Sequence, residues 1–165
     1  MQPLVRPAQP DDCAAIARIY NEGIDERIAT FETAHRIPSD ILHWLEHDHP
    51  VVVVETVGKI AAFAAAHPYR SRPCYDGVRE FSVYGARDSR RQGAGLHALE
   101  ALCAEAEARG WWKLLARIFV ENHPSRRLCA KAGFREVGIY VRHGKLDGVW
   151  RDCVIVERLV GEAAV

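Results

Sequence analysis

The sequence has no excess of charge of either sign and no long hydrophobic run. Lysine plus arginine and aspartate plus glutamate number 22 each in 165 residues. This balance argues against a protein that coats DNA or RNA by bulk electrostatic attraction. No apolar run approaches the ~20 residues that span a bilayer, and the start of the chain lacks the apolar core of a signal peptide. We therefore expect a cytoplasmic protein with neither a nucleic-acid partner nor a membrane partner.

Paired cysteines, internal repeats and low-complexity linkers are also missing. The cysteines are odd in number and form no C-x-x-C pair, so neither a disulfide framework nor a zinc knuckle is indicated. We expect reduced thiols and no bound metal. Because nothing divides the chain, residues 1–165 are expected to form a single domain, and a chain of this length buries about 68–70% of its unfolded surface. The cysteines are Cys13, Cys74, Cys103, Cys129 and Cys153.

What is present is an alternation of β-branched runs and amphipathic segments. Helices are expected behind the caps Asp11–Asp12 and Ser39, from Gly93 to Arg109, and from Ser125, itself a possible N-cap, to Ala132. The order of elements predicts a mixed α/β protein (α+β), with helices on the faces of a mixed sheet. Strands are expected at residues 4–6, 51–55, 59–64, 79–85, 114–119, 135–141 and 151–159.

The segment from residue 79 to residue 96 carries the strongest chemical signal. A strand leads into a loop that ends Arg-x-x-Gly-x-Gly at Arg90, Gly93 and Gly95, and a long helix begins there. Glycines let the backbone approach a ligand closely. Free N–H groups at a helix start favour phosphate, and arginines add charge-assisted donors suited to a pyrophosphate. The segment therefore predicts a phosphorylated cofactor. A Rossmann site fits poorly, because Arg87 to Gln92 separates the strand from the glycines.

These residues resemble the acetyl-coenzyme A pyrophosphate loop of the GCN5-related N-acetyltransferase (GNAT) superfamily. Asn122 to Leu128 and Gly133–Phe134 resemble the second cofactor segment of that family. The resemblance covers almost the whole chain and is strongest to the phosphinothricin and arsinothricin N-acetyltransferase branch. It implies one GNAT-like domain, a mostly antiparallel sheet of about seven strands with helices on both faces, and a homodimer. The branch-specific segments are Thr30–Thr33, Tyr69–Arg72, Tyr75–Asp76, Ser82–Tyr84 and His143–Leu159.

The resemblance implies an enzyme that transfers an acetyl group from acetyl-CoA to a primary amine in a ternary complex. Its substrate would be a glutamate-like amino acid or a toxic analogue (arsinothricin, phosphinothricin or methionine sulfoximine), and the outcome would be resistance. Glu80 is predicted to be the general base, and strand alternation places it on one face with Ser82. The expected cofactor-binding residues are Val83, Tyr84, Gly85, Arg90, Arg91, Gln92, Gly93, Ala94, Gly95, Leu96, Asn122 and Ser125.

Substrate recognition is expected from Phe31, Arg70, Arg72 and Tyr75. A substrate with a second oxyanion needs cationic, forked donors, and arginine fits a carboxylate, phosphinate or arsinate. Cys129 occupies the position where the family often has tyrosine and the branch often has histidine. We interpret Cys129 first as part of the cleft wall and second as a possible general acid.

Three other interpretations remain open. His43 to His47 reads H-x-x-E-H, the spacing of inverted zinc peptidases, but such a site needs a third protein ligand. A non-catalytic acyl-coenzyme A sensor would keep the Arg90–Gly95 loop without using Glu80. The same fold could also acetylate a protein N-terminus or a polyamine. Trp150 and Asp152 are expected either to shape the pocket or to contact a second subunit.

Overall fold

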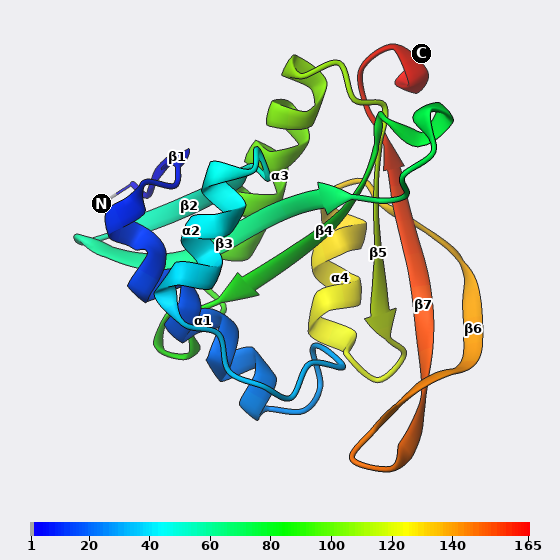
Figure 1. Ribbon diagram of the computed structural model, residues 1–165, viewed down its shortest axis with the longest axis horizontal. Coiled ribbons are helices and arrows are strands. Elements are labelled where there is room, and N and C mark those ends of the chain that lie inside the picture. The colour runs from blue at the N-terminus through cyan, green and yellow to red at the C-terminus, as the bar shows by residue number, and fades with distance from the viewer. Residues whose placement is uncertain (1) are drawn as a thin grey trace.

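A computed structural model describes residues 2–165, in which seven strands form one sheet (Figure 1). The strand order is β1-β2-β3-β4-β5-β7-β6, and every neighbouring pair is antiparallel except β4 with β5. The predicted mixed, mostly antiparallel sheet is therefore confirmed. The strands are β1 (Leu4–Pro7), β2 (Val51–Thr56), β3 (Lys59–Pro68), β4 (Val78–Gly85), β5 (Lys113–Phe119), β6 (Arg135–Leu146) and β7 (Val149–Leu159).

Four α-helices in the described chain cover both faces of the sheet, as predicted (Figure 1). The helices are α1 (Cys13–Asp25), α2 (Pro38–Glu46), α3 (Ala94–Ala108) and α4 (His123–Lys131). Phe63 and Ala65 of β3 pack in a core with α1 and α2, whereas Ala62 and Ala64 pack in a second core with α3 and α4. Strand alternation produces this division, because successive side chains point to opposite faces. No helix in residues 2–165 combines the length and apolarity needed to cross a membrane.

The predicted caps of the first two helices need correction. Asp12 does precede α1, but its carboxylate makes no capping bond to that helix. Ser39 does not cap α2, which begins one residue earlier at Pro38. The carboxylate of Asp40 accepts the N–H of Ile37 at 2.9 Å and takes over the capping role. Proline causes this early start, because its ring holds φ near the helical value and its missing N–H is not needed in the first turn.

The last two strands form a longer hairpin than predicted. β6 runs to Leu146 instead of ending at residue 141, and β7 begins at Val149. The connection is the pair Asp147–Gly148, whose φ angles are +50° and +78°. Two consecutive positive φ angles are typical of the tight turn that matches the twist of antiparallel strands. The segment from His143 to Trp150, recognised from its sequence resemblance, therefore belongs to this hairpin.

The parallel strands β4 and β5 pair over a short distance only. Their register covers Val78–Glu80 against Lys113–Leu115, after which the two strands diverge (Figure 1). Just before the paired segment, the carbonyl of Gly77 accepts the N–H of Trp112 at 2.9 Å. A Cβ atom on Gly77 would lie 2.0 Å from the indole ring, so this close approach requires glycine. Because the β4–β5 pairing ends at Glu80, the sheet opens in its middle from residue 81 onward.

Candidate active site

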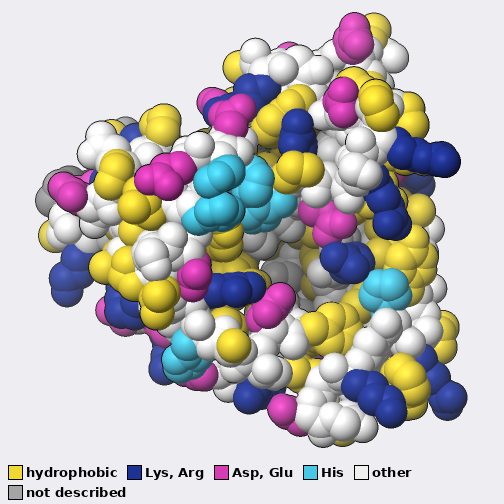
Figure 2. Space-filling view, in the orientation of Figure 1, with side chains coloured by type: hydrophobic (Ala, Val, Ile, Leu, Met, Phe, Trp, Pro, Cys, Tyr) yellow, Lys and Arg dark blue, Asp and Glu magenta, His cyan; other side chains and the backbone are white. Residues whose placement is uncertain are grey.

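A cleft of about 540 Å³ occupies the gap between the diverging ends of β4 and β5. The space-filling view shows a hollow in the middle of this face, with histidine side chains gathered on one rim (Figure 2). The connection from α1 to α2, the helix α4, and one or two positions each of α1, α2, β3 and β7 supply the remaining walls. The lining comprises Tyr20, Ala29, Thr30, Phe31, Glu32, Trp44, His67, Pro68, Glu80, Phe81, Ser82, Val83, Tyr84, Ala116, Arg117, Ile118, Phe119, Asn122, Ser125, Cys129 and Cys153.

Backbone groups of β4 face into this gap. The N–H of Ala86 donates to the carbonyl of Ala61 at 2.8 Å, so the even-numbered residues of β4, Tyr84 included, direct their backbone groups to β3. The odd-numbered Val83 and Gly85 therefore direct theirs to the opposite side, from which β5 has already diverged. Of the three residues predicted to bind the cofactor through their backbone, Val83 and Gly85 face this side, where the carbonyl of Gly85 accepts a 3.5 Å hydrogen bond from Nε of Arg90.

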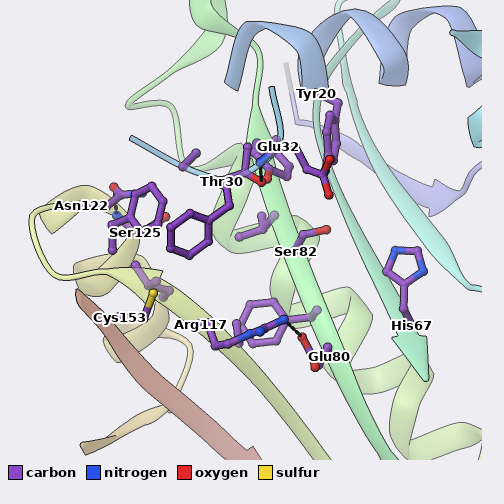
Figure 3. A pocket seen from close by; sticks show the side chains of 18 of the residues that line it. Tyr20, Thr30, Glu32, His67, Glu80, Ser82, Arg117, Asn122, Ser125 and Cys153 are labelled. Carbon is purple, nitrogen blue, oxygen red and sulfur yellow. Dashed lines mark hydrogen bonds and ion pairs between the residues drawn. The ribbon is translucent and has the colours of Figure 1, made fainter. Parts of the chain in front are cut away.

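Glu80 projects into the cleft and forms an ion pair there (Figure 3). Nη2 of Arg117, on β5, donates to Oε2 of Glu80 at 2.9 Å. Arg79, the neighbour of Glu80 in the sequence, instead lies over the ring of Trp111, 4.2 Å from its centroid. Sequence reasoning missed Arg117. The available signal was a single arginine inside an otherwise apolar stretch of β5.

His67 is a second cleft residue that the sequence motifs did not indicate. It lies directly opposite Glu80 in the β3–β4 register. Its Nδ1 is 3.0 Å from Nδ1 of His49, which follows α2. Burial, and then the neighbouring His49, lowers the pKa of His67 to about 4. The imidazole of His67 is therefore neutral at physiological pH.

The first turn of α4 brings Asn122 and Ser125 to the cleft. Oδ1 of Asn122 accepts the N–H of Ser125 at 3.3 Å, and Nδ2 donates to the carbonyl of Ile28 at 3.2 Å. Asn122 is thus the N-cap of α4, and the possibility that Ser125 caps this helix is wrong. The helix starts early because Pro124 is compatible with its first turn. Oδ1 and Nδ2 of Asn122 each have one protein partner here, and each atom can form one more hydrogen bond, so the amide can still bind a ligand.

Cys129 lines the cleft from α4 and is almost fully buried. Burial, and to a smaller extent the nearby Cys103 and Glu136, raises the pKa of the Cys129 thiol to about 12. The thiol therefore remains protonated at neutral pH and is neither an activated nucleophile nor a ready proton donor. This environment fits a wall residue, the first of the two roles considered for Cys129.

The loop before α3 is held in place by α1. The guanidinium of Arg90 makes two hydrogen bonds to the carboxylate of Glu26, at 2.8 and 2.5 Å. These bonds hold the pKa of the Glu26 carboxyl below its usual value. The predicted phosphate-binding arginine is thus paired with an acid 64 residues away, and a pyrophosphate would compete with this acid for the guanidinium.

The turn into α3 has the backbone that a phosphate site needs. Arg91 and Gly93 have positive φ angles of +64° and +81°, and no side chain caps the first turn of α3. The helical N–H groups there remain available to an anion. Gly95 serves a packing role, because a Cβ atom on it would lie 2.8 Å from Cδ1 of Leu128 on α4. Gln92 is exposed, Ala94 is buried and Leu96 packs against the core of α3 and α4.

The four predicted substrate residues do not all reach the cleft. Phe31 lines it and packs edge-to-face on Phe119, with ring centroids 4.7 Å apart. Arg70, Arg72 and Tyr75 lie on the exposed connection between β3 and β4, outside the cleft lining. Trp150 and Asp152 on β7 are also outside it.

The histidine motif of α2 lacks the geometry of a metal site. The rings of His43 and His47 stack with centroids 3.8 Å apart, and His47 lies beyond the last helical residue, Glu46. Among residues 2–165, no group of three or more histidine, cysteine, aspartate or glutamate side chains is arranged to hold a metal ion. The motif therefore gives no structural support to a zinc-peptidase site.

Comparison with known proteins identifies the family. Residues 16–134 match the model of the acetyltransferase (GNAT) family, and the chain therefore belongs to this family and is an N-acetyltransferase. The phosphinothricin N-acetyltransferase of Streptomyces viridochromogenes is 32% identical to it over 90% of this chain and 82% of the relative. The L-methionine sulfoximine/L-methionine sulfone acetyltransferase of Pseudomonas paraeruginosa is 27% identical over 95% of this chain and 94% of the relative.

A solved structure supports the same assignment. The phosphinothricin acetyltransferase of Sinorhizobium meliloti, determined in complex with acetyl-CoA, superposes with a TM-score of 0.90 at 26% identity. The match covers 98% of this chain and 90% of that protein. The family resemblance that the sequence motifs indicated is thus confirmed, together with the GNAT fold.

Proposed function

We propose that this N-acetyltransferase uses acetyl-CoA to acetylate the primary α-amine of a glutamate-like amino acid or a toxic analogue, and so confers resistance. Phosphinothricin, arsinothricin and methionine sulfoximine are the candidate analogues. The names of the relatives and the acetyl-CoA complex of the Sinorhizobium meliloti enzyme support this class of substrate and donor. The observation that carries the proposal is the placement of the Glu80 carboxylate in the cleft, at the point where β4 and β5 separate.

The proposed mechanism is direct transfer within a ternary complex. Glu80 takes a proton from the substrate ammonium, and the resulting amine attacks the thioester carbonyl carbon. The carbon–sulfur bond then breaks, and coenzyme A leaves as a thiolate that takes up the second amine proton. The backbone N–H of Val83, which faces the gap, is suited to stabilise the oxyanion of the intermediate. No acyl-cysteine step is included, because the pKa of Cys129 is raised to about 12.

The proposed donor site runs from the open backbone of β4 to the start of α3. Val83 and Gly85 would hold the pantetheine arm, together with Asn122 and Ser125. The N–H groups of the first turn of α3 and the loop of residues 90–95 would hold the pyrophosphate. Arg90 contributes to this site after exchanging the Glu26 carboxylate for a phosphate.

The proposed enzyme is a single cytoplasmic domain over residues 1–165 that forms a homodimer. The β6–β7 hairpin supports the dimer, because it exposes apolar side chains in one region of the surface. Equilibrium sedimentation should then give twice the chain mass, and replacing Ile139 by lysine should shift the mass toward that of the single chain. The exposed residues are Val137, Ile139, Tyr140, Val141, Val149 and Trp150.

The proposed chemistry is tested by Glu80→Gln, which keeps the size of the side chain and removes its basicity. Turnover should fall about 100-fold or more, the usual effect of losing a general base, while acetyl-CoA affinity measured by calorimetry stays the same. Glu105→Gln is the matched control, because Glu105 pairs with Arg109 on the surface of α3. The acetylated product should be measured by mass spectrometry, since the exposed Cys74 would react with thiol reagents. Unchanged turnover would remove Glu80 from the mechanism.

The same assay separates the alternatives. Phosphinothricin, arsinothricin, methionine sulfoximine, glutamate, a polyamine and a peptide with a free N-terminus should be offered to the wild-type enzyme. Preference for the polyamine or the peptide would overturn the proposed substrate class while leaving the reaction type intact. Binding of acetyl-CoA without turnover of any amine would identify an acyl-coenzyme A sensor.

A further inference from the structure

The Glu80–Arg117 ion pair lies inside the cleft and joins its two diverging strands (Figure 3). Among the described residues that line the cleft, Arg117 is the only arginine or lysine. Its guanidinium reaches from β5 to Glu80 on β4, with Nη2 and Oε2 2.9 Å apart. This one contact uses a single nitrogen of the guanidinium, which leaves its other N–H groups for a ligand.

The pair is not needed to hold the strands together. The side chains of Arg117 and Glu80 are 48% and 29% exposed, and water screens an ion pair of this kind so that it adds little to folding stability. β4 and β5 are already joined by their backbone ladder at residues 78–80. A pair of opposite charges that is accessible in a cleft and dispensable for the sheet is available for ligand binding.

The spacing of the two charges matches the head group of an α-amino acid. Its ammonium and carboxylate are attached to the same carbon, so their charged atoms are about 3 Å apart. This separation is close to the 2.9 Å between Arg117 and Glu80. A zwitterion laid against the pair places its ammonium on Glu80 and its carboxylate on Arg117. One ion pair is thereby extended to four mutually compensating charges.

We infer that Arg117 binds the α-carboxylate of the amino-acid substrate, and that the Glu80–Arg117 pair selects α-amino acids over amines that lack a carboxylate. This inference rests on the proposed function, because it assumes that Glu80 faces the reacting amine. Arginine is suited to the role, since its planar fork can bind a carboxylate through two parallel hydrogen bonds. The second oxyanion, at the far end of the substrate side chain, would be bound by other groups, such as Arg70 and Arg72 on the exposed connection between β3 and β4.

The inference is tested with pairs of substrates that differ only in the α-carboxylate. Phosphinothricin and methionine sulfone are each compared with their decarboxylated amines, using wild type, Arg117→Gln and Arg117→Lys. Loss of a charge-assisted hydrogen bond predicts that Arg117→Gln lowers kcat/KM for the amino acids by about 10- to 100-fold. For the decarboxylated amines, kcat/KM of Arg117→Gln should stay within about twofold of the wild-type value. For the amino acids, kcat/KM of Arg117→Lys should lie between those of wild type and Arg117→Gln, because lysine supplies the charge without the planar fork of two donors.

The control is Arg18→Gln, which removes an exposed arginine from an ion pair with Glu22 on α1 and should change neither class. Thermal unfolding checks the fold of each variant, and Arg117→Lys supplies the comparison if Arg117→Gln is unstable. An equal loss for amino acids and amines, or no loss for either, would overturn the assignment of Arg117 and leave the proposed function standing. If the wild-type enzyme acetylates the decarboxylated amines alone, or none of these compounds, the proposed function and the assignment both fall.

Discussion

Mild acid is expected to destabilise the fold through His67 before carboxylates are protonated. Burial and the neighbouring His49 lower the pKa of His67 to about 4 in the folded chain, from about 6.5 for a free histidine. Between these two values the unfolded chain binds a proton that the folded chain excludes. Because the unfolded state binds more protons in this window, the free energy of unfolding decreases as the pH falls through it.

The size of the effect follows from the shift in pKa. One excluded proton gives a slope of about 1.4 kcal/mol per pH unit, and the shift spans about 2.5 units, so the upper limit is about 3.5 kcal/mol. Water that reaches the half-buried ring reduces this to about 2 kcal/mol. His49 from the connection after α2 and Glu80 from β4 are the titratable neighbours. Burial lowers the pKa of His49 as well, so His49 adds to the effect.

Urea unfolding at several pH values between about 7.5 and 5 measures this slope while carboxylates stay ionised. His67→Gln keeps a hydrogen-bonding group beside His49 without a titrating ring. Between about pH 7.5 and 5, the free energy of unfolding of this variant should fall by about 1 kcal/mol less than that of the wild type. His123→Gln, which removes an exposed imidazole from α4, is the control and should retain the wild-type slope. A wild-type stability that is flat from pH 7 to pH 5, or a His67→Gln slope as steep as that of wild type, would refute the reasoning.

Three further substitutions test the site. Arg72 lies outside the cleft lining but is proposed to bind the oxyanion of the substrate side chain, so Arg72→Ala should raise the KM for the amino acid by about tenfold or more and leave the KM for acetyl-CoA unchanged. Equal effects on both substrates, or no effect on either, would show that Arg72 does not bind the amino acid. Cys129→Ala should keep kcat within about threefold, because the thiol stays protonated, whereas a loss of about 100-fold would make it a proton donor. Gly93→Ala should cost about 1 kcal/mol in thermal unfolding and weaken acetyl-CoA binding in calorimetry, because φ is +81° there. Unchanged thermal stability and acetyl-CoA affinity in Gly93→Ala would show that the turn tolerates a side chain.

The order and type of the elements could be predicted because each carries a strong local signal. The run from Val51 to Val54 is β-branched throughout and forms β2, and glycines with positive φ follow the ends of α3 and α4 at Gly110 and Gly133. The predicted caps failed where a competing local signal was stronger. Pro38 and Pro124 each fit the first turn of a helix and move its start ahead of the serine that we expected to cap it.

The candidate site could be predicted only where its residues are consecutive or nearly consecutive in the sequence. The loop before α3 and the position of Glu80 in the cleft follow from one segment and its family pattern. The pairing of Arg90 with Glu26 and of Glu80 with Arg117 joins residues 64 and 37 positions apart. Such partners depend on how strands and helices are brought together in space, and no periodicity or spacing in the sequence encodes them. The same reason hides His67, whose neighbour His49 belongs to a different element.

The contact between Gly77 and Trp112 makes the width of the active site depend on a position outside the cleft lining. The two halves of the sheet are joined there, and the three paired positions that follow, Val78–Glu80 with Lys113–Leu115, are the point about which β4 and β5 diverge. A side chain at residue 77 would force the indole of Trp112 aside. A small rotation of β4 relative to β5 at this point would change the distance between the two strands more, the farther along them it is measured. We therefore expect a substitution at residue 77 to change the width of the cleft while every residue that lines it stays the same.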